Sequence, residues 1–291
     1  MNFRRKILIL YLALVPLFAW SQASSSELQV ITYNLRSGRG YGHSDPQTTA
    51  ERFRTIGKEI SRYNPDILVI QEPGSNADLY DTLIAAMGDR YRYKLLKCPS
   101  YEESNRIGLL VVSDRISIDG IDHCIQGDDP EVKQLFNHWA RITLRLERQP
   151  IVVYAFKLAP RDRYEMRRRQ IDTLTPYLEK DLAESKYVII AGDLNHRPFD
   201  REYDRWMNLG LTDSYDSLVH GSGFTKMDEL GEDVLTPYRR IDYLLLSPEL
   251  ATTLSGSSRT LQERFFIPSP PERLWSLSDH LPVLATFRFQ N

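Results

Sequence analysis

Five short polar motifs stand where apolar runs of the sequence begin or end. They combine carboxylates, amides, an arginine and an imidazole, and in chain order they are Tyr33-Asn34, Gln71-Glu72, Gly192-Asp193-Leu194-Asn195, Arg240-Ile241-Asp242-Tyr243 and Ser278-Asp279-His280. Oxygen atoms of Asn, Asp and Glu suit a hard cation such as Mg²⁺, which keeps several waters and binds substrate phosphate. Zinc favours His and Cys ligands instead. The set therefore indicates metal-assisted chemistry on a phosphoester.

No single motif carries this interpretation. An Asp-His pair is common in surface turns, a Gly-Asp pair forms tight turns with an Asx hydrogen bond, and a Gln-Glu pair can end a solvated strand. The five together, in this order, are hard to explain without one shared site. The fold must then bring together residues from both ends of the chain.

The elements that position these motifs are mostly strands. Continuous apolar runs at 67–70 and 187–191 are typical of strands buried on both faces. Further strands are predicted at 28–35, 91–96, 107–112, 116–121, 141–146, 151–158, 241–246 and 283–289, and helices at 48–63, 77–87, 164–182 and 201–209. The short break at Arg148-Gln149-Pro150 predicts a hairpin.

Two sheets packed face to face, with helices outside both, would bury these apolar strands. A plain doubly wound sheet would need a more regular alternation of strands and helices. Asn34, Glu72 and Asp193 each stand where a strand ends, and His280 stands just before one begins. Ligands collect at strand ends in layered α/β folds, because the loops there converge on one crevice.

The N-terminus has the features of an export signal. Arg4-Arg5-Lys6 precedes an apolar stretch at 7–20, and Ser21-Gln22-Ala23 offers a cleavage point. We expect a signal peptide at 1–23, one domain at 24–291, and a periplasmic or secreted protein. The apolar stretch is short for a membrane span, although an N-terminal anchor remains the alternative. No transmembrane span is expected after the signal is removed.

Charge and cysteine content limit the function classes. The leader carries three basic and no acidic residues, so its removal takes the formal net charge from −2 to −5. Such an acidic chain is not typical of a nucleic-acid coat protein. The two cysteines, Cys98 and Cys124, could pair after export. The sequence has no CxxC motif, which argues against a thiolate zinc site.

The five motifs together resemble the endonuclease/exonuclease/phosphatase (DNase I-like) superfamily, over essentially the whole mature chain. The resemblance implies an α/β fold, a four-layer α/β/β/α sandwich of two mostly antiparallel sheets with helices outside. It implies a divalent cofactor, Mg²⁺ or Mn²⁺, with Ca²⁺ possible. It also implies a phosphoester substrate, and we infer no obligate protein partner.

The resemblance assigns roles to individual residues. Glu72 corresponds to the principal metal carboxylate, with Asn34 nearby on metal or phosphate and Asp279 completing the metal shell. Asp193 and Asn195 would orient the attacking water and the phosphoryl oxygens.

Further roles fall on His280, Asp242 and Arg240. His280 would contact the phosphate or act as a base, held by Asp242. A carboxylate bonded to one ring nitrogen fixes the imidazole tautomer and raises its basicity. Arg240 would be structural or would contact phosphate.

One position departs from the family pattern. The family carries a His at the end of the strand before its long helix, where this chain has Lys157. A lysine is a permanent cation at neutral pH. Lys157 could therefore bind substrate phosphate and stabilise a phosphorane by its charge, but it is a weaker general acid unless burial lowers its pKa.

We therefore expect a phosphodiesterase or nuclease that acts outside the cytoplasm. A phosphatase or phospholipid head-group hydrolase of the same superfamily is the first alternative. A non-catalytic binding module is the second, because of Lys157. The arginines between positions 161 and 169 would be a phosphate clamp or a solvated helix face.

Overall fold

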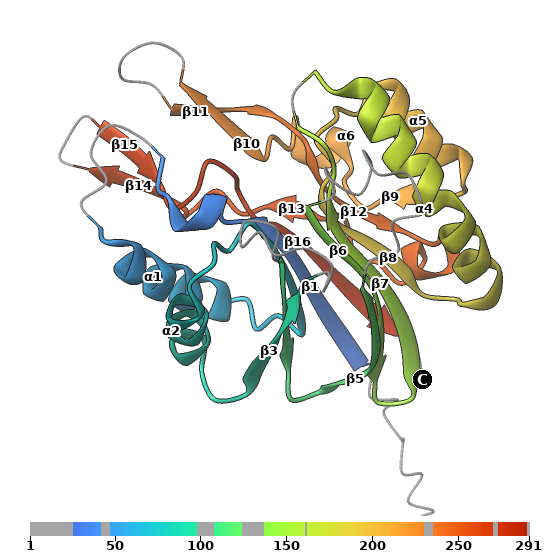
Figure 1. Ribbon diagram of the computed structural model, residues 1–291, viewed down its shortest axis with the longest axis horizontal. Coiled ribbons are helices and arrows are strands. Elements are labelled where there is room, and N and C mark those ends of the chain that lie inside the picture. The colour runs from blue at the N-terminus through green and yellow to red at the C-terminus, as the bar shows by residue number, and fades with distance from the viewer. Residues whose placement is uncertain are drawn as a thin grey trace, which may run out of the picture.

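Two six-stranded sheets pack face to face between outer helices, as Figure 1 shows. The computed structural model describes residues 26–41, 47–97, 108–123, 137–160, 162–229, 235–269 and 273–289. The arrangement is the predicted four-layer α/β/β/α sandwich. The leader and both cysteines lie outside the described residues, so the signal peptide and the disulfide stay predictions.

The first sheet has the strand order β13-β16-β1-β2-β4-β3. Its strands are β1 (Ser26–Asn34), β2 (Ile67–Gln71), β3 (Tyr91–Leu96), β4 (Gly108–Ser113), β13 (Arg259–Thr260) and β16 (Val283–Phe289). Two helices, α1 (Thr49–Ser61) and α2 (Ala77–Met87), cover its outer face. A capping box between Thr48 and Glu51 fixes the start of α1, since both side chains bond the opposite backbone N–H.

The second sheet has the order β5-β6-β7-β8-β12-β9. Its strands are β5 (Ile116–His123), β6 (Asn137–Leu146), β7 (Gln149–Lys157), β8 (Val188–Asp193), β9 (Thr212–Asp213) and β12 (Asp242–Leu246). The helices α4 (Tyr164–Glu184) and α5 (Arg201–Asn208) cover its outer face. The predicted hairpin is confirmed, because β6 and β7 pair antiparallel along their length.

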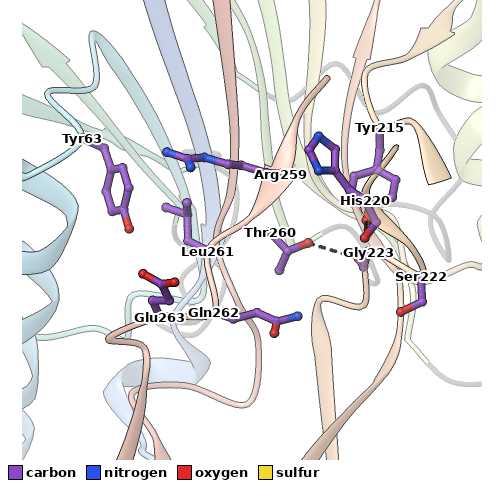
Figure 2. A pocket seen from close by; sticks show the side chains of 10 residues that line it. All are labelled: Tyr63, Tyr215, His220, Ser222, Gly223, Arg259, Thr260, Leu261, Gln262 and Glu263. Carbon is purple, nitrogen blue, oxygen red and sulfur yellow. Dashed lines mark hydrogen bonds between the residues drawn. The ribbon is translucent and has the colours of Figure 1, made fainter. Parts of the chain in front are cut away.

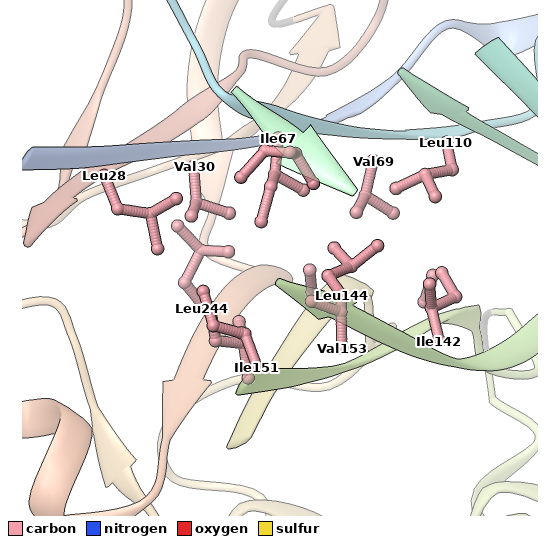
Figure 3. Close-up of a cluster of buried hydrophobic side chains, with 14 of the residues drawn as sticks. Leu28, Val30, Ile67, Val69, Leu110, Ile142, Leu144, Ile151, Val153 and Leu244 are labelled. Atoms are coloured by element: carbon pink, nitrogen blue, oxygen red, sulfur yellow. The ribbon is translucent and has the colours of Figure 1, made fainter. Parts of the chain in front are cut away.

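The continuous apolar runs are explained by burial on both faces of each sheet. In β1, Leu28 and Val30 point into the core between the sheets, whereas Ile31 and Tyr33 point toward the helices. Figure 3 shows side chains of both sheets meeting in the inner core. A strand covered on both sides shows no polar alternation, because successive side chains face opposite layers that are both dry.

Each sheet contains one parallel pair among its described strands. The pair β1 and β2 is joined through α1, and β7 and β8 through α4. The paired ends are Asn34 beside Gln71 in one sheet and Lys157 beside Asp193 in the other. Parallel strands end at the same edge, so each sheet delivers polar side chains to one end of the sandwich.

Smaller elements complete the described fold. They are η1 (Arg36–Gly38), α6 (Ser217–His220), α7 (Pro248–Ala251), and two hairpins, β10–β11 (Lys226–Glu229 and Leu235–Arg239) and β14–β15 (Phe266–Ser269 and Arg273–Ser276). Figure 1 shows both hairpins projecting near η1. The sequence reasoning missed them. No helix in the described ranges is both long and apolar enough to cross a membrane.

A buried histidine holds the loop that follows β8. The Trp206 indole N–H donates to Nε2 of His196 at 2.9 Å, and the imidazole stacks on Tyr243 with ring centroids 5.1 Å apart. The Tyr243 hydroxyl also donates to the His196 carbonyl at 2.9 Å. Since Nε2 must accept from Trp206, the ring is neutral with its proton on Nδ1. Burial lowers the pKa of His196 to about 4.

This histidine predicts an acid-sensitive fold. In the unfolded chain His196 titrates near about 6.5, so between that pH and about 4 the unfolded state binds the extra proton. The contribution of His196 to the free energy of unfolding should therefore fall by up to about 3 kcal/mol as pH drops through this window, and this contribution should level off below it. Urea titrations at several pH values, on the parent and on His196→Gln, measure this directly. An identical pH slope in both proteins would contradict the assignment.

Candidate active site

The central cluster joins the two sheets at their shared end. The Asn34 side-chain amide, on β1, donates to Oδ2 of Asp193, on β8, at 3.0 Å. The same amide lies 3.4 Å from Oε1 of Glu72. The Lys157 ammonium donates to Glu72 and lies 3.3 Å from Oδ2 of Asp193. Two of these four contacts, Asn34–Asp193 and Lys157–Glu72, cross from one sheet to the other, so the cluster depends on how the sheets pack.

Strained backbone surrounds this cluster. Seven described non-glycine residues have a positive φ, and four of them flank the cluster: Arg36, Ser37, Glu72 and Asn195. Such conformations cost about 1–3 kcal/mol each and persist where the surroundings enforce them. Hydrogen bonds do so here: Ser37 N–H donates to the Glu72 carbonyl at 2.6 Å, and the Asn195 amide to the Leu158 carbonyl at 3.1 Å.

A carboxylate–imidazole pair forms the second part of the site. Nδ1 of His280 lies 2.9 Å from Oδ2 of Asp242, and the Thr225 hydroxyl donates to the same oxygen at 2.5 Å. The pairing leaves Nε2 of His280 facing the cluster, 3.9 Å from Asp193 and 3.8 Å from Asp279. The free ring nitrogen therefore points to where a substrate or water would lie.

Asp279 closes the site on its other side. Its Oδ2 accepts from the Lys226 ammonium and lies 3.4 Å from Nε of Arg36. Its Oδ1 is buried and has no hydrogen-bond partner among the described residues. An unsatisfied buried carboxylate oxygen costs free energy, and a bound cation would satisfy it.

Electrostatic interactions keep both Glu72 and Lys157 ionised. Burial alone would raise the pKa of the Glu72 carboxyl, but the adjacent Lys157 ammonium outweighs it and holds that pKa below its ordinary value. Burial would lower the pKa of Lys157, yet Asp193 and Glu72 raise it well above its ordinary value. Lys157 therefore stays charged, which makes it a poor proton donor and a strong fixed charge.

The pKa of His280 moves in the direction a base requires. Burial would lower it, but Asp242, reinforced by Asp193, raises it above the ordinary histidine value. Asp193 shifts the other way: burial would raise the pKa of its carboxyl, and the Lys157 ammonium lowers it. Asp193 is therefore the anion at the centre of the site, and the His280 imidazole binds a proton more tightly than an ordinary histidine does.

Two sets of residues could hold a cation. Asp193, Asp242 and His280 each offer a ligand atom within 4.8 Å of the others. Both oxygens of Asp242 already face the His280 ring, however, and one also accepts from Thr225. The hydrogen-bonded arrangement is the better description of that set.

The other set is Asn34, Glu72 and Asp279. Its donors are all oxygens, as Mg²⁺ and Mn²⁺ prefer. It includes the unsatisfied Asp279 Oδ1, and the Glu72 side chain is 26% exposed, which leaves room for an ion that keeps waters. The residues present therefore fit a hard divalent ion.

The structure brings together most of the residues expected at the site. They are Asn34, Glu72, Lys157, Asp193, Asn195, Asp242, Asp279 and His280. Arg240 stands apart, because its guanidinium donates to Asp213 at 2.7 Å and lies 4.7 Å from the Tyr243 ring centroid. Its substrate-binding role stays a prediction without support from these contacts.

Two arginines of α4, Arg167 and Arg168, pair with acidic residues of the protein. Arg167 is buried and pairs with Glu202 of α5 at 2.9 Å, and it also donates to the Ala159 carbonyl. Arg168 pairs with Glu165 on the surface at 2.9 Å. Arg161 lies outside the described residues. Arg167 therefore fixes the turn after Lys157, a structural role.

Sequence reasoning missed several residues of the site. Lys226 and Arg36 bind Asp279, and Thr225 binds Asp242. Ser278, within a recognised motif, donates from its hydroxyl to the Asn34 carbonyl at 2.7 Å. Lys226 and Thr225 come from a short hairpin and its approach, where no apolar run or polar pair marks the sequence. Their place at the site is visible only in the tertiary structure.

A separate hollow of about 470 Å³ lies along β13, away from this cluster (Figure 2). Arg259, Tyr63, Tyr215 and His220 line it, and Thr260 donates to the Gly223 carbonyl at 3.2 Å. It contains none of the predicted site residues. Its size alone does not make it the reaction site.

Comparisons with known proteins agree with this geometry. The sequence model of the Endonuclease/Exonuclease/phosphatase family matches residues 31–280. No curated protein is close enough in sequence to match.

Solved structures share the fold at low identity. Truncated TDP2 of Caenorhabditis elegans is 18% identical, with a TM-score of 0.64, over 90% of this chain and 97% of that one. A family protein of Bacteroides thetaiotaomicron is 16% identical, with a TM-score of 0.64, over 92% and 99%. The human nocturnin catalytic domain, solved with a sulfate anion, is 21% identical, with a TM-score of 0.62, over 90% and 94%.

At these identities the solved structures establish the fold alone, whereas the family model covers most of the sequence. The chain, with its motifs gathered at one end of a four-layer sandwich, belongs to the endonuclease/exonuclease/phosphatase family, whose members are hydrolases of phosphoester bonds.

Proposed function

We propose that this chain is an exported, divalent-metal-dependent phosphodiesterase of the nuclease type. The observation that carries the proposal is the cluster at the sheet junction, where ionised carboxylates, a fixed ammonium and a carboxylate-held imidazole converge. Export rests on the leader at 1–23, so the site of action is the periplasm or the medium.

A divalent ion held by Glu72, Asp279 and Asn34 would polarise a phosphoryl oxygen and offset developing charge. The protein's own groups do the rest. Asp193 and Asn195 orient the attacking water, and Nε2 of His280 accepts its proton while Nδ1 stays hydrogen-bonded to Asp242. As the new P–O bond forms, the P–O bond to the leaving alkoxide breaks on the opposite side, and solvent water protonates the alkoxide. Lys157 contributes a fixed positive charge to the pentacovalent transition state. Positioning and electrostatics supply most of the rate in such sites.

The charge of the site favours a diester. Four carboxylates (Glu72, Asp193, Asp242 and Asp279) face three permanent cations (Lys157, Lys226 and Arg36), which leaves one negative charge while His280 is neutral. One divalent ion would turn this into one positive charge. That matches a phosphodiester, which carries a single negative charge, better than a doubly charged monoester.

Two structural relatives point to ligands of this chemistry. Danio rerio TDP2 is known in complex with a single-stranded DNA product, and human nocturnin was solved with sulfate. We therefore place nucleic acid first among the diesters. The alternative is a non-catalytic binding module. One observation favours it: the Lys157 ammonium donates to the Glu72 carboxylate, which is the expected metal ligand.

Removing either the metal carboxylate or the base should abolish hydrolysis. Glu72→Gln and His280→Ala should each lower kcat/KM for bis-p-nitrophenyl phosphate with Mn²⁺ by about 100-fold or more. His220→Ala serves as control, since that imidazole is exposed and outside the cluster. A parent protein that turns over no phosphoester in any divalent metal would leave the binding-module alternative standing.

The Asp242–His280 pair predicts a specific pH profile. As a base, His280 works when neutral, so activity should rise with pH through its raised pKa. Asp242→Asn removes the main cause of that rise, so the acidic limb should move to lower pH while kcat falls by about 100-fold. The pH dependence of kcat for both proteins measures the shift. An unmoved acidic limb would show that another group sets it.

The charge argument predicts the ester class. The parent should hydrolyse bis-p-nitrophenyl phosphate at least about tenfold faster, in kcat/KM, than p-nitrophenyl phosphate. Chelation with EDTA should stop both reactions, and Mg²⁺ or Mn²⁺ should restore them. Preference for the monoester would transfer the assignment to a phosphatase. Single-stranded DNA, RNA and phospholipid substrates then divide the diester class.

A further inference from the structure

Lys157 occupies an unusual place for a lysine. Its ammonium stands at the end of β7, the side chain is only 9% exposed, and both of its ion pairs are with carboxylates. One is Oε1 of Glu72, across the sheet junction, and the other is Oδ2 of Asp193, in register on β8. The ammonium therefore bridges a carboxylate of the metal set and the central carboxylate of the site.

The two carboxylates differ in what else supports them. Asp193 is fully buried, so its charge needs a permanent partner; Lys157 supplies the positive charge and Asn34 a hydrogen bond. Glu72 is partly open to solvent, and among the described residues Lys157 is the cation that neutralises it. An isolated buried charge is expensive, whereas a part-exposed one is solvated. Lys157 can thus leave Glu72 more cheaply than Asp193.

A divalent ion and an ammonium cannot share the same carboxylate oxygen without repulsion. Like charges a few ångströms apart, in a partly desolvated crevice, oppose each other strongly. The Oε1 atom that Lys157 holds belongs to the carboxylate that the resemblance assigns to the metal. Occupation of Glu72 by the ammonium and by an ion are therefore competing states of one site.

We propose that Lys157 is a built-in counter-ion of the metal site, which holds Glu72 in the metal-free protein and is displaced from it by the divalent ion. The proposal rests on the proposed function, because it takes Glu72 as a metal ligand. On displacement the ammonium keeps Asp193 and turns a hydrogen-bond donor toward the crevice, where a phosphate oxygen can accept it. Lys157 thereby sets how tightly the ion binds.

Lys226 plays a different part. It contacts Asp279 through Oδ2, and the other oxygen, Oδ1, has no hydrogen-bond partner among the described residues. An ion can bind Asp279 through that free oxygen while Lys226 keeps its bond to Oδ2, although the two charges still repel. Competition for the same oxygen atom therefore lies on the Glu72 side, which a substitution at Lys157 tests.

The test measures Mn²⁺ affinity rather than activity. Isothermal titration and Mn²⁺ electron paramagnetic resonance would be applied to the parent, Lys157→Met and Glu72→Gln. Lys157→Met should bind Mn²⁺ about tenfold tighter or more, because the competing charge is gone. Glu72→Gln should lose binding. Lys58→Met, an exposed lysine on α1, gives the matched control for one lost positive charge and should bind as the parent does.

The outcomes separate the inference from the proposed function. If Lys157→Met binds no tighter than the parent while Glu72→Gln still abolishes binding, the counter-ion role is wrong and the metal enzyme stands. If no protein binds Mn²⁺, both fall. Lys157→Gln, which keeps a donor for Asp193, repeats the measurement should the methionine variant misfold, and an affinity gain there supports the inference equally.

Discussion

The buried carboxylate of Asp193 is the constraint on which the rest of this structure depends. It lies at the end of β8 with no exposed surface, so its charge has to be balanced by groups of the protein. Asn34 reaches it from the first sheet, Lys157 from the neighbouring strand, and the Asn195 N–H from its own loop. A relative shift of the two sheets would leave this buried carboxylate without its hydrogen bond from Asn34. The packing of the sandwich and the assembly of the site are therefore one event.

The strained backbone around the sheet junction is stabilised by nearby hydrogen bonds. The left-handed backbone at Glu72 and Asn195 is held by hydrogen bonds from the two sides of the crevice. The loop of Asn195 is in turn fixed by the neutral His196, clamped between Trp206 and Tyr243. Rigid apolar layers beneath hold a charged, strained end in place, which is how a site can stay preorganised without a ligand.

The sequence located the long strands of both sheets and the four long helices, because long apolar runs leave little choice of structure. It missed the short elements, which carry no sustained pattern: the β10–β11 and β14–β15 hairpins, β9, β13, α6, α7 and η1. Lys226 and Thr225, which complete the site around Asp279 and Asp242, come from the first of these and its approach. The motif predicted Arg240 at the site because its neighbour Asp242 lies there, but the Arg240 side chain donates to Asp213 instead. Adjacency in a motif does not fix the direction in which each side chain points.

The sequence by itself determined which residue types could do chemistry, where strands end, and the layered class of the fold, since these depend on local order and apolar periodicity. Only the tertiary structure decided which charges meet. The pairing of Lys157 with both Glu72 and Asp193, and the open oxygen of Asp279, arise where two sheets touch. Coulomb energy depends on distance and burial, and neither is written in the spacing of residues along a chain.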